Sequence, residues 1–261
     1  MSALHSQLAV LFEGQGDVAQ FEQLAQTLGV LLIESTALGD TPFFLTWREG
    51  ELKLLDRELL KKGGLSIDIA PRSGEQRSYP APKEGAFAQA IGRKTKTVVD
   101  ATTGWAQDSL CLFRMGYDMT CIERSPIMAQ LIADAFARLT HESWVQKLEL
   151  APPRLLHGNA IDVLQSLDTA PDCIYLDPMF PPKRKKSALS KKSMTILHEL
   201  VGEDLDKEHL FEAAFAATSK RVVVKSPDYA PPLGGKPSES FAGKLLRYDV
   251  YFKSSSPSLI I

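Results

Sequence analysis

The order of apolar and polar residues divides the chain into two parts. In the first part, short apolar runs alternate with turns around a single expected helix, 17–28, whose first turn Asp17 can cap. A hairpin is the clearest feature, because two strand-like runs, 43–48 and 51–56, flank the turn Glu49-Gly50. Alternation at period two predicts a further strand over 65–69.

The second part follows residues 71–82, which hold three prolines and are typical of a linker. Beyond it, strands alternate with helices, a pattern that predicts a parallel α/β sheet. The expected strands are 97–99, 119–122, 154–157, 173–176 and 221–224, with a last one within 245–252. The best helix is 125–139, where Ser125 can cap the first turn and Pro126 fits the first helical position. We therefore expect a small N-terminal α+β domain with its linker over residues 1–82 and an α/β domain over 83–261.

Composition narrows the protein class without choosing a function. The 261 residues carry 30 Lys and Arg against 32 Asp and Glu, so a nucleic-acid surface would have to come from local clustering. The apolar runs are of strand length, far short of the roughly 20 residues of a membrane span, and the N-terminus lacks a basic leader. A cytoplasmic protein without a membrane partner is expected. Three scattered cysteines and five unclustered histidines predict no metal site.

The first two predicted parallel strands end in residues suited to a nucleoside cofactor. The turn from Asp100 contains Gly104 and leads into a helix, but it has no G-x-G-x-x-G pattern, which weakens the dinucleotide interpretation. Glu123 ends the second strand 23 residues after Asp100, close to the spacing at which an acid accepts ribose hydroxyls. Its alternative is a surface ion pair with Arg124. S-adenosylmethionine fits this combination better than NAD does, and Asn159-Ala160 after the third strand could meet the adenine edge or simply cap a helix.

The fourth strand ends in Asp177-Pro178-Met179-Phe180, which selects a reaction. An Asp, a Pro and an aromatic ring in this order resemble the (D/N)-P-P-(Y/F) signature of methyltransferases that modify amino groups conjugated to a planar ring. Such an amine is a poor nucleophile and needs orientation, which the Asp177 carboxylate and the Pro178 carbonyl can supply by accepting its N–H groups. Phe180 would stack on the unpaired base. The alternative interpretation of this motif is a proline-rich loop with a purely structural role.

A run of positive charge follows the motif directly. Its members are Lys183, Arg184, Lys185, Lys186, Lys191 and Lys192. Charge runs are usually solvated loops, but this one lies beside the expected site of the target base. We expect it to neutralise phosphates of a nucleic-acid substrate.

Taken together, these segments resemble a known family, the bacterial RsmJ (YhiQ) methyltransferases, which methylate N2 of a guanosine in 16S ribosomal RNA. The resemblance rests on four segments: 100–108, 122–124, 175–192 and 222–232, the last reading V-V-V-K-S-P-D-Y-A-P-P. It covers residues from about 97 to the C-terminus. It implies a Rossmann-like class I S-adenosylmethionine-dependent methyltransferase sheet and, as substrate, 16S ribosomal RNA or the small ribosomal subunit.

The resemblance also implies a set of cofactor contacts. They are Gln107-Asp108, Glu123-Arg124, Asn159-Ala160 and Asp177, beside the Asp100 and Gly104 turn. Two departures stand out. Where the family commonly reads G-x-G-R-D, this chain has Ala106 and Gln107, and where it often has two serines this chain has Asn159-Ala160, so that Ala160 can bind only through its backbone.

The motif alone leaves other functions open. Adenine N6 or cytosine N4 would suit the same amine chemistry, and so would a protein glutamine, although those enzymes typically carry N-P-P-Y. An RNA-binding module with a vestigial methyltransferase fold is an alternative of another class. A NAD-dependent dehydrogenase is disfavoured by the missing glycine pattern.

Overall fold

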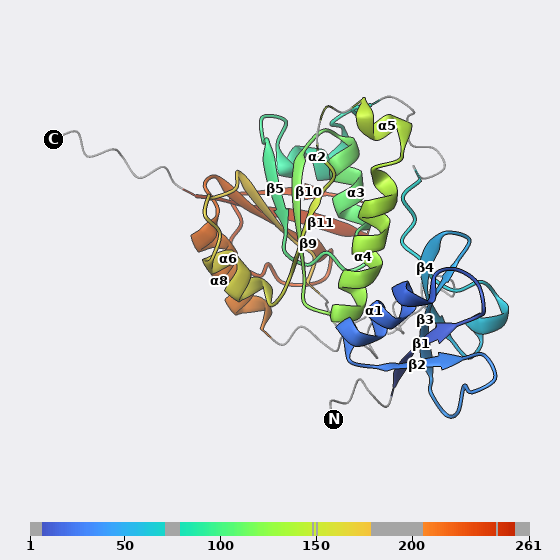
Figure 1. The fold of residues 1–261 in the computed structure, drawn as a ribbon. Helices are drawn as coiled ribbons and strands as arrows, with labels where there is room; N and C mark the ends of the chain where they lie inside the picture. Colours follow the sequence, from blue (N-terminus) through green and yellow to red (C-terminus); the bar gives the residue numbers. More distant parts are fainter. Residues whose placement is uncertain are drawn as a thin grey trace.

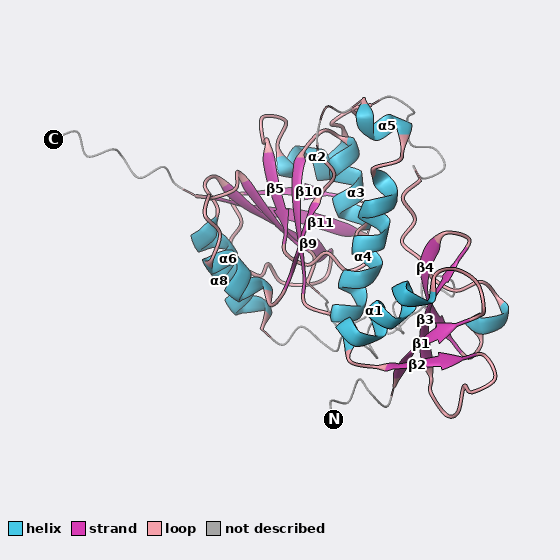
Figure 2. Ribbon diagram, viewed as in Figure 1, coloured by secondary structure: helices cyan, strands magenta, loops and turns pink. Residues whose placement is uncertain are grey.

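The computed structural model describes residues 7–70, 79–147, 149, 151–178, 206–243 and 245–253. These residues form two β-sheets, one of seven strands and one of four, together with the helices that pack on them (Figures 1 and 2). None of the described helices is long and apolar enough to cross a membrane.

The seven-stranded sheet carries the parallel strands that the sequence predicted. Its spatial order is β10-β11-β9-β8-β5-β6-β7. The strands are β5 (Thr97–Asp100), β6 (Asp118–Glu123), β7 (Arg154–His157), β8 (Cys173–Leu176), β9 (Arg221–Pro227), β10 (Glu239–Ala242) and β11 (Leu246–Phe252). Strands β5 to β9 are parallel, whereas β11 is antiparallel to β9 and β10 to β11. Because β5 pairs with both β6 and β8, the chain order reverses at β5, which is where such sheets bind ligands.

Alternate residues of the central strands supply two separate cores. Val98 packs into a core with α3 (Gln107–Arg114) and α4 (Pro126–Leu139), while its neighbour Val99 packs into a core with α6 (Ala160–Gln165) and α8 (Lys207–Ala217). Burial on both faces explains why the central strands are almost wholly apolar. Helix α4 begins as expected, because the Ser125 side chain accepts a hydrogen bond from the Met128 amide at 3.4 Å.

The four-stranded sheet is built by the N-terminal part of the chain. Its order is β2-β1-β3-β4, formed by β1 (Leu8–Phe12), β2 (Leu31–Glu34), β3 (Phe43–Arg48) and β4 (Glu51–Asp56), with α1 (Val18–Leu28) between β1 and β2. The predicted hairpin is confirmed as the antiparallel pair β3–β4. The predicted helix is confirmed as well, with the Asp17 carboxylate accepting the Ala19 amide at 3.1 Å.

Two strand assignments differ from the sequence prediction. The strand expected over 65–69 is wrong, because only Leu65 forms a bridge, with Leu54. The backbone carbonyls of Ile67 and Ile69 accept hydrogen bonds from arginine side chains of α4 and α3, in place of the backbone amides of a neighbouring strand. Strand β10 and helix α2 (Gly85–Ile91) were not predicted, and β10 is a short, mostly exposed edge strand that lacks an alternating pattern.

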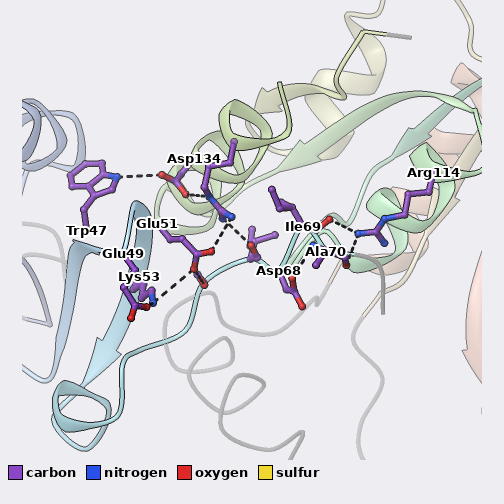
Figure 3. Close-up of polar contacts among 12 residues, drawn as sticks. Trp47, Glu49, Glu51, Lys53, Asp68, Ile69, Ala70, Arg114 and Asp134 are labelled. Carbon is purple, nitrogen blue, oxygen red and sulfur yellow. Dashed lines mark hydrogen bonds and ion pairs between the residues drawn. The ribbon is translucent and has the colours of Figure 1, made fainter. Parts of the chain in front are cut away.

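Side-chain hydrogen bonds join the small sheet to the helices of the large one (Figure 3). The Trp47 indole donates to the Asp134 carboxylate on α4 at 3.2 Å, and Arg138, one turn later, binds Asp134, Glu51 and the carbonyl of Ile67. Arg114 at the end of α3 donates to the carbonyls of Ile69 and Ala70 at 2.7 and 2.8 Å (Figure 3). Apolar residues of the small sheet also share one contiguous core with the face of the large sheet that packs on α3 and α4, and the boundary after residue 82 stays a prediction.

The remaining described helices are short. They are α5 (Ser143–Gln146) and a 3-10 turn, η2 (Leu59–Lys61).

Candidate active site

The turn after β5 is organised by a buried carboxylate. Asp100 is 1% exposed, and it accepts hydrogen bonds from the Thr102 amide at 3.1 Å and from the Ser109 hydroxyl. Burial raises the pKa of Asp100 to about 7, against the opposing effect of these two donors, and the nearby carboxylates Asp108 and Asp177 add to the rise. Asp100 therefore fixes the conformation of the turn from inside.

Glu123 links this turn to the end of β6. Its Oε2 accepts the Gly104 amide at 2.9 Å and its Oε1 accepts the Ser125 amide at 2.7 Å. Burial raises the pKa of Glu123, whereas these backbone donors lower it. Gly104 has φ +51°, a conformation in which a side chain is unfavourable, and an added Cβ would meet only the Thr102 carbonyl oxygen at 3.9 Å. No side chain of the described residues therefore covers the backbone on the side where a Cβ of residue 104 would project.

Helix α3 starts from a strained position. Ala106, fully buried, has φ +55° and precedes Gln107, the first helical residue. This is the position at which the sequence departs from G-x-G-R-D, so the alanine occupies a left-handed conformation that glycine adopts more easily. Gln107 is exposed and Asp108 is half-buried in the first turn.

Asp177 and Asp108 share one cation. Lys225 of β9 donates to the Asp108 Oδ2 at 2.7 Å and to the Asp177 Oδ2 at 2.8 Å. The Tyr175 hydroxyl donates to the same Asp108 oxygen at 2.7 Å. Asp177 is also held through its backbone, because its amide donates to the Thr102 hydroxyl at 2.6 Å. The carboxylate that follows β8 is therefore tied both to the turn after β5 and to the first turn of α3.

Lys225, Tyr175 and Thr102 were not predicted as site residues. Lys225 could have been found, because parallel pairing of β8 with β9 aligns Leu176 with Val224, so that Lys225 of β9 lies beside Asp177, the residue that follows β8. Thr102 and Tyr175 carry no comparable signal, since a threonine in a turn and a tyrosine in a buried strand are both common.

Asn159 has a structural duty. Its side-chain oxygen caps α6 by accepting the Ile161 amide at 2.9 Å, so the helix-cap interpretation holds, and Ala160 is the first residue of that helix. The Gly158 amide donates to the Glu123 carbonyl at 2.9 Å, which brings this segment beside the end of β6. Arg124 follows Glu123 and is half-buried.

Part of the predicted site lies outside the described residues. Pro178 is the last described residue of the motif and is buried. The predicted site residues that lie outside the described part of the chain are Met179, Phe180, Lys183, Arg184, Lys185, Lys186, Lys191 and Lys192. In the described part, the ends of β5, β6 and β8 come together, and no group of three or more His, Cys, Asp or Glu side chains there is arranged to hold a metal ion.

Comparison with known proteins identifies the family. A family model of SAM-dependent methyltransferases matches residues 31–253. Ribosomal RNA small subunit methyltransferase J of Tolumonas auensis is 39% identical over 249 residues, covering 94% of this chain and 97% of that protein. The protein of the same name from Aeromonas hydrophila is also 39% identical, with the same coverage.

A solved structure has the same fold. The crystal structure of a SAM-dependent methyltransferase from Neisseria gonorrhoeae superposes with a TM-score of 0.69 at 25% sequence identity, covering 96% of this chain and 98% of that one. The parallel sheet with its reversal at β5 is therefore a Rossmann-like methyltransferase sheet, and the cofactor is S-adenosylmethionine. The chain belongs to the ribosomal RNA small subunit methyltransferase J family of S-adenosylmethionine-dependent enzymes.

Proposed function

We propose that this enzyme methylates the exocyclic N2 amine of a guanosine in 16S ribosomal RNA, in the cytoplasm, acting on the RNA or on the small ribosomal subunit. The observation that carries the proposal is the place of Asp177, a half-buried carboxylate that follows β8 beside the reversal of chain order and is held by Lys225 and Thr102. The printed names of the relatives supply the class of substrate.

The described residues fit the cofactor. Glu123 presents a carboxylate at the end of β6 whose two oxygens are fixed by the Gly104 and Ser125 amides, and a carboxylate oxygen can accept further hydrogen bonds from a ribose diol. We assign cofactor contacts to the turn from Asp100 to Asp108, to Glu123-Arg124, to Asn159-Ala160 and to Asp177. S-adenosylmethionine, when bound, supplies a methyl group activated by a sulfonium.

The chain's own role in the chemistry is to orient the amine. The Asp177 carboxylate and the Pro178 carbonyl would accept the two N–H groups of the target, so that its lone pair points at the methyl group. As the nitrogen becomes positive, the negative charge of Asp177 would stabilise it by accepting a hydrogen bond from its N–H group. Phe180 would hold the base plane by stacking.

We assign RNA binding to the basic segment after the motif, from Lys183 to Lys192. Six positive charges that follow the motif directly in the sequence would bind phosphates, and such contacts weaken as salt rises. No described residue favours adenine N6 or cytosine N4 over guanine N2, and the ordered group of carboxylates around Lys225 does not favour a vestigial fold.

Nucleoside mass spectrometry tests the proposal. Small-subunit RNA from a strain that lacks this enzyme is incubated with purified protein and S-adenosylmethionine, then digested to nucleosides. We expect N2-methylguanosine to be the methylated nucleoside that appears. The appearance of N6-methyladenosine or N4-methylcytidine would contradict the proposal, as would the absence of any new methylated nucleoside.

A further inference from the structure

Lys225 lies at the centre of a compact group of charges. Its ammonium bonds to one oxygen of Asp108 at 2.7 Å and to one oxygen of Asp177 at 2.8 Å, and only 23% of its side chain is exposed. Both carboxylates are therefore close to one another as well as to the cation. Burial by itself disfavours the charged amine, but Asp177 and Asp108 outweigh it and raise the pKa of Lys225.

The two acids that Lys225 joins belong to different parts of the site. Asp108 lies in the first turn of α3, which begins at the turn after β5, and Asp177 begins the motif loop after β8. The proposed function assigns Asp108 to the cofactor, and it assigns Asp177 to the target amine as well as to the cofactor. Lys225 thus connects the segment that faces the methyl donor with the carboxylate that faces the acceptor.

We propose that Lys225 is a positioning residue for methyl transfer, which joins the Asp108 and Asp177 carboxylates through its two ion pairs and fixes the Asp177 carboxylate at a set distance from the cofactor-binding turn. The inference rests on the proposed function for the identity of the amine, but the charge arrangement is independent of it.

Removal of the ammonium would leave two like charges close together without the cation that joins them. Two carboxylates close together cannot both ionise easily, so one of them would take up a proton at a higher pH than in the wild type. A protonated Asp177 would lose its negative charge opposite the positive nitrogen, and its side chain would lose the ion pair with Lys225 that orients it. The Thr102 hydroxyl would still hold the Asp177 amide, so the backbone should stay in place.

Other titratable groups face this cluster and must be considered in any pH experiment. They are Asp100 after β5, Cys111 on α3, Tyr175 on β8 and Tyr248 on β11. Burial raises the pKa of Tyr248 to about 12 and that of Tyr175 well above its ordinary value, so neither tyrosine ionises at neutral pH. Asp100 has a pKa of about 7, raised in part by Asp108 and Asp177, so its own titration must be told apart from theirs in every variant.

The chain offers a matched control on the same two strands. Lys220 precedes β9 and bonds to Asp172, which precedes β8, at 2.7 Å, and 54% of its side chain is exposed. This pair lies at the opposite end of β8 and β9 from Lys225. Lys220→Met removes the same charge from the same part of the fold without touching the proposed site.

The test compares Lys225→Met, Lys225→Arg and Lys220→Met over a range of pH. Single-turnover methylation of small-subunit RNA gives the rate, calorimetric titration gives S-adenosylmethionine affinity, and thermal unfolding checks the fold. A fourth measurement needs neither RNA nor cofactor: carboxyl NMR of protein labelled with ¹³C-aspartate, assigned with Asp108→Asn and Asp177→Asn.

In Lys225→Met we expect the single-turnover rate at neutral pH to fall by about 100-fold, the size of effect that misplacement by about 1 Å can cause. Cofactor affinity should change less than the rate does. The acid limb of the pH–rate profile and the titration of one aspartate carboxyl should both move up by about one to three pH units. Lys225→Arg should keep the wild-type acid limb and recover much of the rate, and Lys220→Met should behave as the wild type.

Two results would overturn the inference. One is a folded Lys225→Met protein whose aspartates titrate as in the wild type. The other is Lys225→Arg with its acid limb displaced from that of the wild type by about one pH unit or more. This comparison needs only the wild type and Lys225→Arg, so it still decides if the methionine variant does not fold. If the wild type fails to methylate guanosine, the proposed function fails, and the carboxyl titration alone decides the role of Lys225.

Discussion

Glu123→Gln should separate the two duties that the structure gives this residue. The wild-type carboxylate accepts the Gly104 amide at 2.9 Å and the Ser125 amide at 2.7 Å while remaining 6% exposed. Glutamine has one oxygen and one NH2 group at the same positions, so one of the two backbone amides would face a donor in place of an acceptor. The substitution therefore removes the negative charge and one structural hydrogen bond together.

The magnitude follows from those losses. A hydrogen bond to a charged group contributes about 1.5 to 3 kcal/mol, which corresponds to a loss of roughly 10- to 150-fold in S-adenosylmethionine affinity. An unpaired buried amide costs about 1 to 3 kcal/mol of unfolding free energy. Removal of a buried charge offsets part of that cost, since burial raises the pKa of Glu123 and thus disfavours its ionised form.

Calorimetric titration with S-adenosylmethionine and urea unfolding measure the two effects. Cofactor affinity of the wild type should fall on mild acidification, because Glu123, with its raised pKa, becomes protonated at a higher pH than an ordinary glutamate, and Glu123→Gln should lack this part of the pH dependence. Glu239→Gln, on the exposed edge strand β10, is the matched control. Affinity of Glu123→Gln within twofold of the wild type would refute the assignment of Glu123 to the cofactor.

Three further predictions follow from the described turns and the basic segment. The pKa of Asp100, about 7 in the fold, lies above its unfolded value, so the contribution of Asp100 to stability is lost as pH rises from about 4 to about 7. Asp100→Asn lacks this loss. Its free energy of unfolding in urea should therefore rise relative to that of the wild type by on the order of 4 kcal/mol across that pH range. At Ala106, with φ +55°, valine should lower the unfolding free energy by more than about 2 kcal/mol, whereas glycine should change it by less than about 1 kcal/mol, because relief of strain offsets the lost methyl group and the added chain entropy. Filter binding at several salt concentrations should show weaker RNA binding and a flatter salt dependence, with unchanged cofactor affinity, when alanine replaces Lys183, Arg184, Lys185 and Lys186; a full salt slope would exclude the segment from the RNA interface.

The sequence predicted the parallel strands because their apolar runs are buried on both faces, as Val98 and Val99 show by packing into opposite cores. It failed over 65–69, where alternation arises from burial of Ile67 and Ile69 while their carbonyls bind arginines far away in the sequence. Short-range patterns report which side chains are buried, but they do not report where the backbone hydrogen bonds go.

The same limit applies to the site. Asp177 and Glu123 could be selected because each follows a predicted strand, and residues at the ends of parallel strands meet at one edge of the sheet. The bond from Lys225 to Asp108 joins residues 117 positions apart, and it depends on strand order, which no local pattern contains. The left-handed conformation of Ala106 could not be predicted from the sequence either, since alanine rarely adopts it.

One measurement tests the central claim directly: single-turnover methyl transfer to guanosine N2 of small-subunit RNA by wild type and by Asp177→Ala, with both substrates saturating. Loss of the acceptor that orients the amine should nearly abolish the step, even though RNA and cofactor are bound. We expect N2-methylguanosine from the wild type and almost none from the variant. Transfer by Asp177→Ala at close to the wild-type rate would contradict the assignment of Asp177 as the residue that orients the amine.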